Sequence, residues 1–121
     1  MTLALTVGCW LAACSSGGSD DRTLDAEVEG AASGPARTTV DRCEFDGTNR
    51  LAAAGVVRNA GDIEHHVAIS VRFVDGDGVR VDIASDSVSA LRPGESARWD
   101  ASVYVEGAAD AVRCEVTAEA S

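Results

Sequence analysis

Apolar and polar residues alternate along most of the chain beyond residue 38, most clearly between residues 66 and 74. Successive side chains of a β-strand point to opposite sides of the sheet, so a two-residue repeat predicts a strand that is buried on one face. The buried face of this strand would carry four apolar side chains: Val67, Ile69, Val71 and Phe73. Asp-Gly-Asp-Gly follows at 75–78, where glycine permits the positive φ angles of a tight turn. The alternation resumes at 79–83, so the whole stretch predicts a β-hairpin.

The same alternation recurs at short intervals through residues 39–121. Besides the hairpin, strands are predicted at residues 39–45, 50–58, 96–105 and 112–118, separated by turns rich in Gly, Asn, Asp and Pro. The polar run at 84–87 indicates that the strand begun at 79 ends or moves to the other sheet there. Trp99 lies on an apolar face and would be the main aromatic residue of the core. We therefore expect residues 39–121 to form an all-β domain, an immunoglobulin-like β-sandwich of six to seven strands.

The N-terminus has a different pattern. Residues 1–13 are mostly apolar but too few to span a bilayer, and they end in small residues before Cys14, as a secretion signal does. Signal peptides begin with a basic segment, but only Met1 and Thr2 precede the apolar run, so the sequence leaves open whether Met1 is the true start. Residues 14–38 are rich in Ser, Gly and acidic residues, and we expect a flexible tether there, with at most a transient helical turn. The alternative is that residues 3–13 form a buried strand or helix and that Cys14 is an ordinary thiol.

The sequence Leu11-Ala12-Ala13-Cys14 resembles the lipobox of bacterial lipoproteins. In that family a signal peptidase cuts before the cysteine, whose sulfur then carries diacylglycerol, and the new N-terminus is usually acylated as well. The resemblance implies that Cys14 is lipidated and that the protein is exported and anchored to the outer face of the bacterial cell membrane. Two or more acyl chains would give stable anchoring.

The net charge and the amino-acid composition exclude one class of partner and indicate how the core is built. The formal net charge is −10, and all ten basic residues are Arg. Nucleic acids are bound through a basic footprint, so we expect no nucleic-acid partner. Aromatic residues are few, so the core must be built mainly from small apolar side chains and would benefit from a covalent crosslink.

The four cysteines suggest where that crosslink lies. Cys9 would leave with the signal segment and Cys14 would carry lipid, which leaves Cys43 and Cys114 on the inward faces of the first and last predicted strands. Export permits a disulfide between them. The bridge would close a loop of 71 positions, and the chain-entropy model predicts that such a bridge stabilises the fold by roughly 4 kcal/mol. The alternatives are two buried thiols or a thiol metal site, although the chain lacks further zinc ligands at useful spacing.

Three segments resemble the FxLYD domain, an immunoglobulin-like module common in bacterial lipoproteins. They are residues 55–59 (Gly-Val-Val-Arg-Asn), 71–78 (Val-Arg-Phe-Val-Asp-Gly-Asp-Gly) and 91–97 (Leu-Arg-Pro-Gly-Glu-Ser-Ala). The naming motif maps onto residues 71–75, where Asp75 matches and the apolar positions keep their character. The resemblance covers roughly residues 40–119. It implies an exported sandwich without known catalytic residues.

Candidate chemistry is sparse. His65 and His66 could serve as metal ligands or a general base, but neighbouring side chains in a strand point to opposite faces. Asp75 and Asp77 resemble the start of a calcium loop and are weak Ca²⁺ candidates, although turn chemistry alone accounts for them. Tyr104, on a polar face, could anchor a partner.

We therefore expect a binding or scaffolding module of the cell envelope, with an unknown envelope protein or peptide as its partner, without catalysis and without a cofactor. One alternative is a small hydrolytic or metal-dependent enzyme that uses His65 and His66 with nearby Asp residues. Another is a spacer whose sheet edge recruits an extended peptide by strand addition.

Overall fold

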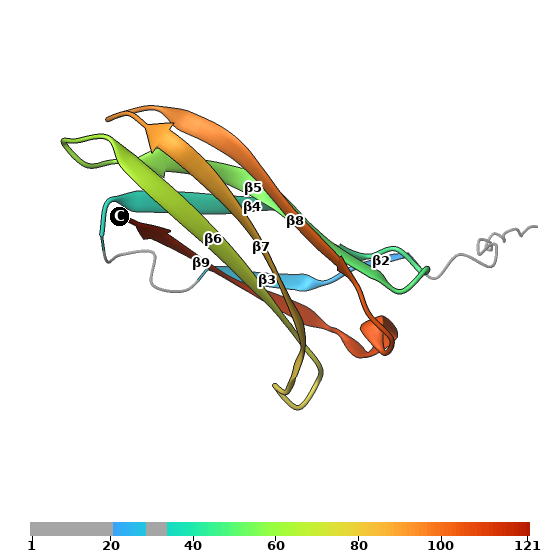
Figure 1. Cartoon of the computed structure of the whole chain (residues 1–121). Helices are drawn as coiled ribbons and strands as arrows, with labels where there is room; N and C mark the ends of the chain where they lie inside the picture. Colours follow the sequence, from blue (N-terminus) through green and yellow to red (C-terminus); the bar gives the residue numbers. More distant parts are fainter. Residues whose placement is uncertain (1–20, 29–33) are drawn as a thin grey trace, which may run out of the picture.

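The computed structural model describes residues 21–28 and 34–121. Within these residues, eight strands form two sheets with the orders β2-β4-β5-β8 and β3-β9-β6-β7, which pack face to face (Figure 1). The strands are β2 (Arg22–Thr23), β3 (Asp25–Val28), β4 (Ala36–Phe45), β5 (Arg50–Asn59), β6 (His65–Val74), β7 (Arg80–Leu91), β8 (Ser96–Tyr104) and β9 (Arg113–Ala120). A 3-10 turn, η2 (Ala108–Asp110), precedes β9.

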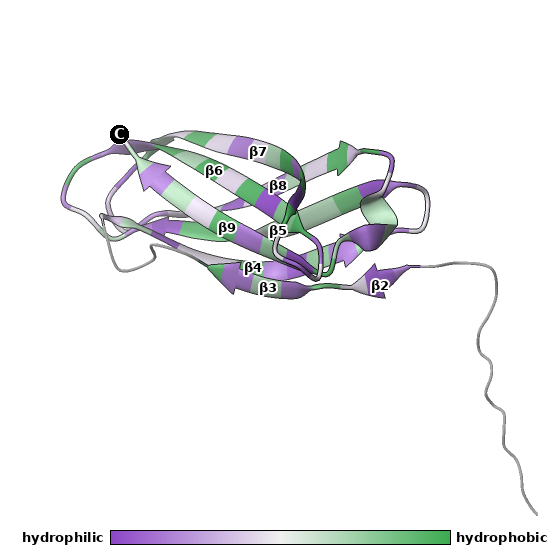
Figure 2. Cartoon of the chain, turned by 90° about the horizontal axis from the view of Figure 1, so that it is seen from below, coloured by the Kyte–Doolittle hydropathy of each residue, from purple (hydrophilic) through white to green (hydrophobic). Residues whose placement is uncertain are grey.

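The all-β sandwich predicted from the alternation is confirmed. In β6 the predicted inward side chains are all buried: Val67, Ile69, Val71 and Phe73. Figure 2 shows the same alternation as bands of hydrophobic and hydrophilic residues along the strands. The strand order consists of two hairpins, β4–β5 and β6–β7, extended by β8 and β9 respectively. Counted from β4 as strand A, the first sheet contains the order A-B-E and the second the order F-C-D. Constant-type immunoglobulin domains have the orders A-B-E-D and C-F-G, so the main difference is that the fourth strand, β7, lies beside β6 in the second sheet.

The tether predicted at residues 14–38 is wrong for part of its length. Residues 22–23 and 25–28 form β2 and β3, and β4 begins at Ala36. The predicted domain itself has six strands, β4 to β9, as expected, and β2 and β3 are added to them. Between β2 and β3 the chain crosses from one sheet to the other, and the side chain of Leu24 is only 4% exposed. The backbone N–H of Leu24 donates to the carbonyl oxygen of Cys43 at 2.8 Å. A buried leucine, backbone hydrogen bonds and the side chains of Arg22 and Glu27 hold this segment, and none of these produces an apolar repeat.

The strand end predicted after residue 83 is also wrong, because β7 continues to Leu91. Among the strands at residues 21–28 and 34–121, β7 is the outermost of its sheet, with a neighbour on one edge only. Ser85 and Ser87 are exposed to solvent there. A polar run is therefore compatible with a strand at this position, which the sequence pattern alone does not reveal.

Trp99 is the largest fully buried side chain of the core, as predicted. It lies on the inner face of β8 opposite Gly55 of β5, and its indole N–H donates to Oγ1 of Thr38 on β4 at 2.8 Å. The ring therefore spans the width of the central strand. A Cβ atom at Gly55 would come within 2.9 Å of the ring atom Cζ2, so this crossing requires glycine.

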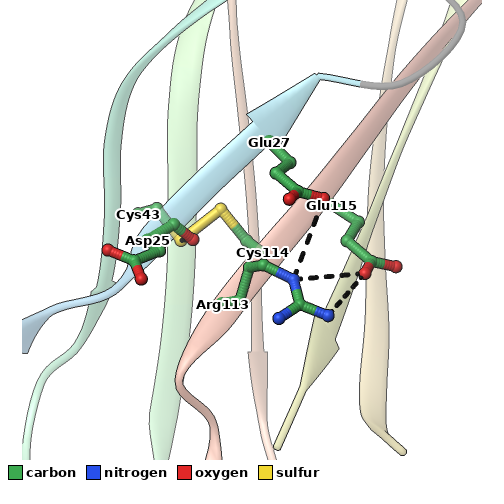
Figure 3. Close-up of a disulfide and its surroundings, with 6 residues drawn as sticks. All are labelled: Asp25, Glu27, Cys43, Arg113, Cys114 and Glu115. Carbon is green, nitrogen blue, oxygen red and sulfur yellow. Dashed lines mark hydrogen bonds and ion pairs between the residues drawn. A yellow bond between two sulfur atoms is a disulfide. The ribbon is translucent and has the colours of Figure 1, made fainter. Parts of the chain in front are cut away.

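The predicted disulfide between Cys43 and Cys114 is confirmed, with a Cα–Cα distance of 6.4 Å. It joins β4 of one sheet to β9 of the other, and both residues are buried. β3 lies beside the bridge, with the carbonyl oxygen of Asp25 3.7 Å from Sγ of Cys43 (Figure 3). The two sheets are thus crosslinked beneath the N-terminal strands.

Candidate functional site

The antiparallel order gathers the connections at two ends of the sandwich (Figure 1). The first, which we call the β2 end, contains the start of β2 and three connections: residues 46–49, 75–79 and 105–112. The second, the Asn59 end, contains residues 34–35 before β4, the connections at 60–64 and 92–95, and Ser121. Because binding residues are often carried by loops on a rigid scaffold, each end is a candidate site.

Asn59 organises the end that bears its name. It is the last residue of β5, is only 1% exposed, and uses both functional groups of its side-chain amide. Its Nδ2 donates to the carbonyl oxygens of Ile63 and Leu91, each at 2.8 Å, and its Oδ1 accepts from the N–H of Gly61 at 2.8 Å. Its backbone bonds to Gly94 and Glu95 of the β7–β8 turn at 2.7 and 3.0 Å. One residue therefore fixes two loops from inside the domain.

The sequence interpretation missed this role and treated Asn59 only as a turn residue. Its partner Leu91 lies 32 positions away in the chain, so no local pattern could indicate that contact. A signal did exist in the short segment itself, because Asn side chains commonly accept from the backbone two residues on, as Asn59 does from Gly61. The network fixes the backbone of Ile63 through its carbonyl oxygen, whereas the residue itself is 65% exposed.

His65 and His66 begin β6 at the Asn59 end. His65 is half-buried and its Nδ1 has no hydrogen-bond partner among the described residues, whereas His66 is exposed. The two neighbouring side chains belong to opposite faces of the strand. Within residues 21–28 and 34–121, no group of three or more His, Cys, Asp or Glu side chains is arranged to hold a metal ion.

Asp75 and Asp77 lie in the β6–β7 turn at the β2 end. Oδ1 of Asp75 accepts from the backbone N–H groups of Asp77 and Val79 at 2.9 and 3.0 Å. Gly78 adopts a positive φ of 80°, as a tight turn requires. The carboxylate of Asp75 thus has a structural role in closing the hairpin.

A surface cavity of about 360 Å³ is lined by the bulged part of β4, by β5 and β8 of the same sheet, and by β7 of the other sheet. Seven residues line it: Asp41, Arg42, Ala54, Asp86, Arg98, Trp99 and Asp100. Arg98 pairs with Asp41 at 3.6 Å. Arg42 pairs instead with Glu44, which does not line the cavity, at 3.4 Å.

Asp86 also determines what the edge formed by β7 and β8 can bind. Its Oδ1 accepts from the backbone N–H of Ser87 at 2.8 Å, and its Oδ2 accepts from the N–H of Asp100 in β8 at 2.9 Å. Farther along β7, Oδ1 of Asp82 accepts from the N–H of Ile83 at 2.7 Å. These carboxylates occupy edge N–H groups that an added strand would need, which weakens the case for strand addition at this edge.

The outer face of the second sheet carries a row of ion pairs across β3, β9 and β6, of which Figure 3 shows those of Arg113 with Glu27 and Glu115. Arg113 of β9 contacts Glu115 at 2.9 Å and Glu27 of β3 at 3.8 Å, and Arg72 of β6 contacts Glu115 at 2.7 Å. The hydrogen bonds from Arg113 and Arg72 lower the pKa of Glu115, against the opposing effect of partial burial. The hydrogen bond to Glu115 likewise raises the pKa of Arg113. This row ties β3 to the sheet and is structural.

Cys14 lies outside the described residues. In the part of the chain that the structure covers, no helix has the length and hydropathy needed to cross a bilayer. Comparison of the chain with models of known protein families, with curated proteins and with solved structures gives no match. The fold itself defines the class: a disulfide-bridged β-sandwich with organised loops at both ends.

Proposed function

We propose that the chain is a lipid-anchored module, with an FxLYD-like sandwich, on the outer face of the bacterial cell membrane. There it binds or scaffolds another component of the envelope and performs no catalysis. The observation that carries the proposal is the order of features along the chain. A lipobox-like sequence ending at Cys14 is followed by a polar segment and then by a disulfide-bridged sandwich. Disulfides persist outside the cytosol, so the bridge agrees with export.

The geometry makes such anchoring workable. Residues 15–21 separate Cys14 from the start of β2, and an extended chain spans about 3.3–3.6 Å per residue. The β2 end would thus lie within roughly 30 Å of a lipidated Cys14. Strands of ten residues, such as β5, are roughly 33 Å long. The Asn59 end would lie about that much farther from the lipid and would be free to meet a partner.

Three measurements test the proposal. Cells that process lipoproteins, grown with radioactive palmitate, should label the full chain but not the Cys14→Ala variant. An epitope added after Ser121 should be accessible to antibody on intact cells. Cys43 and Cys114 should resist thiol alkylation until a reductant is added. Failure of the wild type to take up label, or label that persists in Cys14→Ala, would show that the anchoring is wrong.

A further inference from the structure

Residues 62–64 form a projection at the Asn59 end, which we call the Ile63 knob. Ile63 exposes 65% of its surface, and it stands between two exposed acidic residues, Asp62 and Glu64. We propose that this knob is the contact by which the module binds its envelope partner, and that the partner is a protein with an apolar socket rimmed by Lys or Arg side chains. The inference rests on the proposed function, since it names the partner's chemistry for the same binding module.

The first argument is the way the knob is held. Burying an amide is unfavourable unless all its polar groups find partners, and an apolar residue at position 59 would serve the core without that requirement. Asn59 instead uses its side chain to fix the backbone of Gly61 and Ile63. The network therefore shapes a loop. A loop already held in one conformation loses less entropy on binding, which favours affinity.

The second argument comes from a comparison with Val79, which is 59% exposed on the β6–β7 turn. That turn is closed by its own Asp75, and hairpin formation alone accounts for its order. It also lies at the β2 end, to which the anchored segment would lead. Ile63 lies at the opposite end, on a loop fixed by a buried residue. Val79 is therefore a matched control of similar size and exposure.

The third argument is charge. Neither Asp62 nor Glu64 has an ion pair or side-chain hydrogen bond among the described residues, whereas Arg92 and Glu95 of the adjacent turn pair with each other at 3.8 Å. The two carboxylates therefore flank the apolar side chain of Ile63, and no basic side chain of the described residues pairs with them. The complement of such a surface is an apolar pocket with basic residues at its rim. Rim charges of this kind act mainly on the association rate and its salt dependence.

The experiment uses the full, lipidated chain in intact cells. The photo-crosslinking amino acid p-benzoylphenylalanine replaces Ile63 in one strain and Val79 in the control strain, each with and without the pair of substitutions Asp62→Arg and Glu64→Arg. We expect a discrete adduct from position 63, an adduct at least about ten-fold weaker from position 79, and roughly ten-fold loss from position 63 after charge reversal. Mass spectrometry should place the adduct on an apolar residue of the partner that neighbours Lys or Arg. Thermal melting checks that each variant is folded.

Four results would overturn the inference: equal yields from both positions, an adduct unaffected by charge reversal, a mapped residue without basic neighbours, or no adduct from position 63. The same crosslinker at Ile83 and Tyr104 separates this failure from failure of the proposed function. Adducts from those positions but not from position 63 would support the proposed binding function and show that the Ile63 knob is not the contact. Silence at all four positions would reject both.

Discussion

Gly55 lies where Trp99 crosses the central strand β5, and replacing it with alanine tests how the sandwich is packed. An added Cβ atom would lie 1.9 Å from the carbonyl oxygen of Thr39 and 2.9 Å from Cζ2 of Trp99. Real Cβ contacts are longer than 3.0 Å, so the backbone of β4 would have to retreat by about 1 Å or more. That movement falls beside the register shift between Val40 and Arg42, where the pairing of β4 with β5 is already irregular.

Overpacking in a well-filled core costs about 1–3 kcal/mol, and here the obstacle is backbone, which cannot adopt another rotamer. We therefore expect Gly55→Ala to lower the free energy of unfolding by about 3 kcal/mol. For a domain of this size that corresponds to a fall in Tm of roughly 12–24 °C. Urea unfolding followed by far-UV circular dichroism measures the change, provided that the m-value stays constant.

Gly76→Ala is the matched control, because an added Cβ there meets nothing within 4 Å and the φ angle of Gly76 is not in the left-handed region. This variant should change the free energy of unfolding by less than about 0.5 kcal/mol, or stabilise by up to about 1 kcal/mol through the unfolded chain. The assigned crossing of Trp99 over β5 is incorrect if Gly55→Ala has the urea midpoint of the wild type. It is also incorrect if both variants lower the free energy of unfolding by the same amount.

Four further variants test other parts of the structure. Asn59→Ala should cost about 2–4 kcal/mol in urea unfolding, since it leaves buried backbone groups without partners; a cost below about 0.5 kcal/mol would contradict this. Asp86→Ala should increase self-association in sedimentation relative to the wild type, because it frees edge N–H groups on β7 and β8; unchanged sedimentation would show that the carboxylate does not protect the edge. Replacing Cys43 and Cys114 together by alanine should lower the free energy of unfolding by roughly 4 kcal/mol, and an unchanged urea midpoint would refute that. The pKa of Glu115 is lowered by folding, so its stabilisation is present above the unfolded-state pKa of about 4.3 and is lost as pH falls through the folded value. Glu115→Gln should therefore be less stable at pH 7 and lose less on acidification, and parallel pH curves for variant and wild type would contradict the assignment.

Much of the fold could be predicted from the sequence because its central strands are amphipathic. β6 buries every second residue, and this repeat survives whatever the neighbouring strands are. The disulfide could be predicted for a related reason, since Cys43 and Cys114 share inward faces with apolar neighbours. The order in which the strands pair could not be predicted in this way. Nothing local in β5 indicates that it lies between β4 and β8.

The parts that escaped prediction are those held by backbone or edge contacts. β3 exposes three of its four residues, so its membership of the sheet depends on backbone pairing with β9 and on the ion pair between Glu27 and Arg113. The second half of β7 carries polar residues because it borders solvent. The network around Asn59 joins segments that are distant in the chain, and only the folded arrangement brings them together.

The two ends of the domain are stabilised by different means, and strand direction explains why. A chain that enters at β2 and runs back and forth must place the β5–β6 and β7–β8 connections at the far end. Near the entry, the Cys43–Cys114 bridge joins β4 to β9, and Arg113 of β9 pairs with Glu27 of β3. A membrane anchor at Cys14, as proposed, would apply load at this end. At the far end, hydrogen bonds from one buried side chain fix the loops. Such bonds determine loop shape while leaving the surface of Ile63 open, which a covalent bridge or an apolar cluster at the same place would not do.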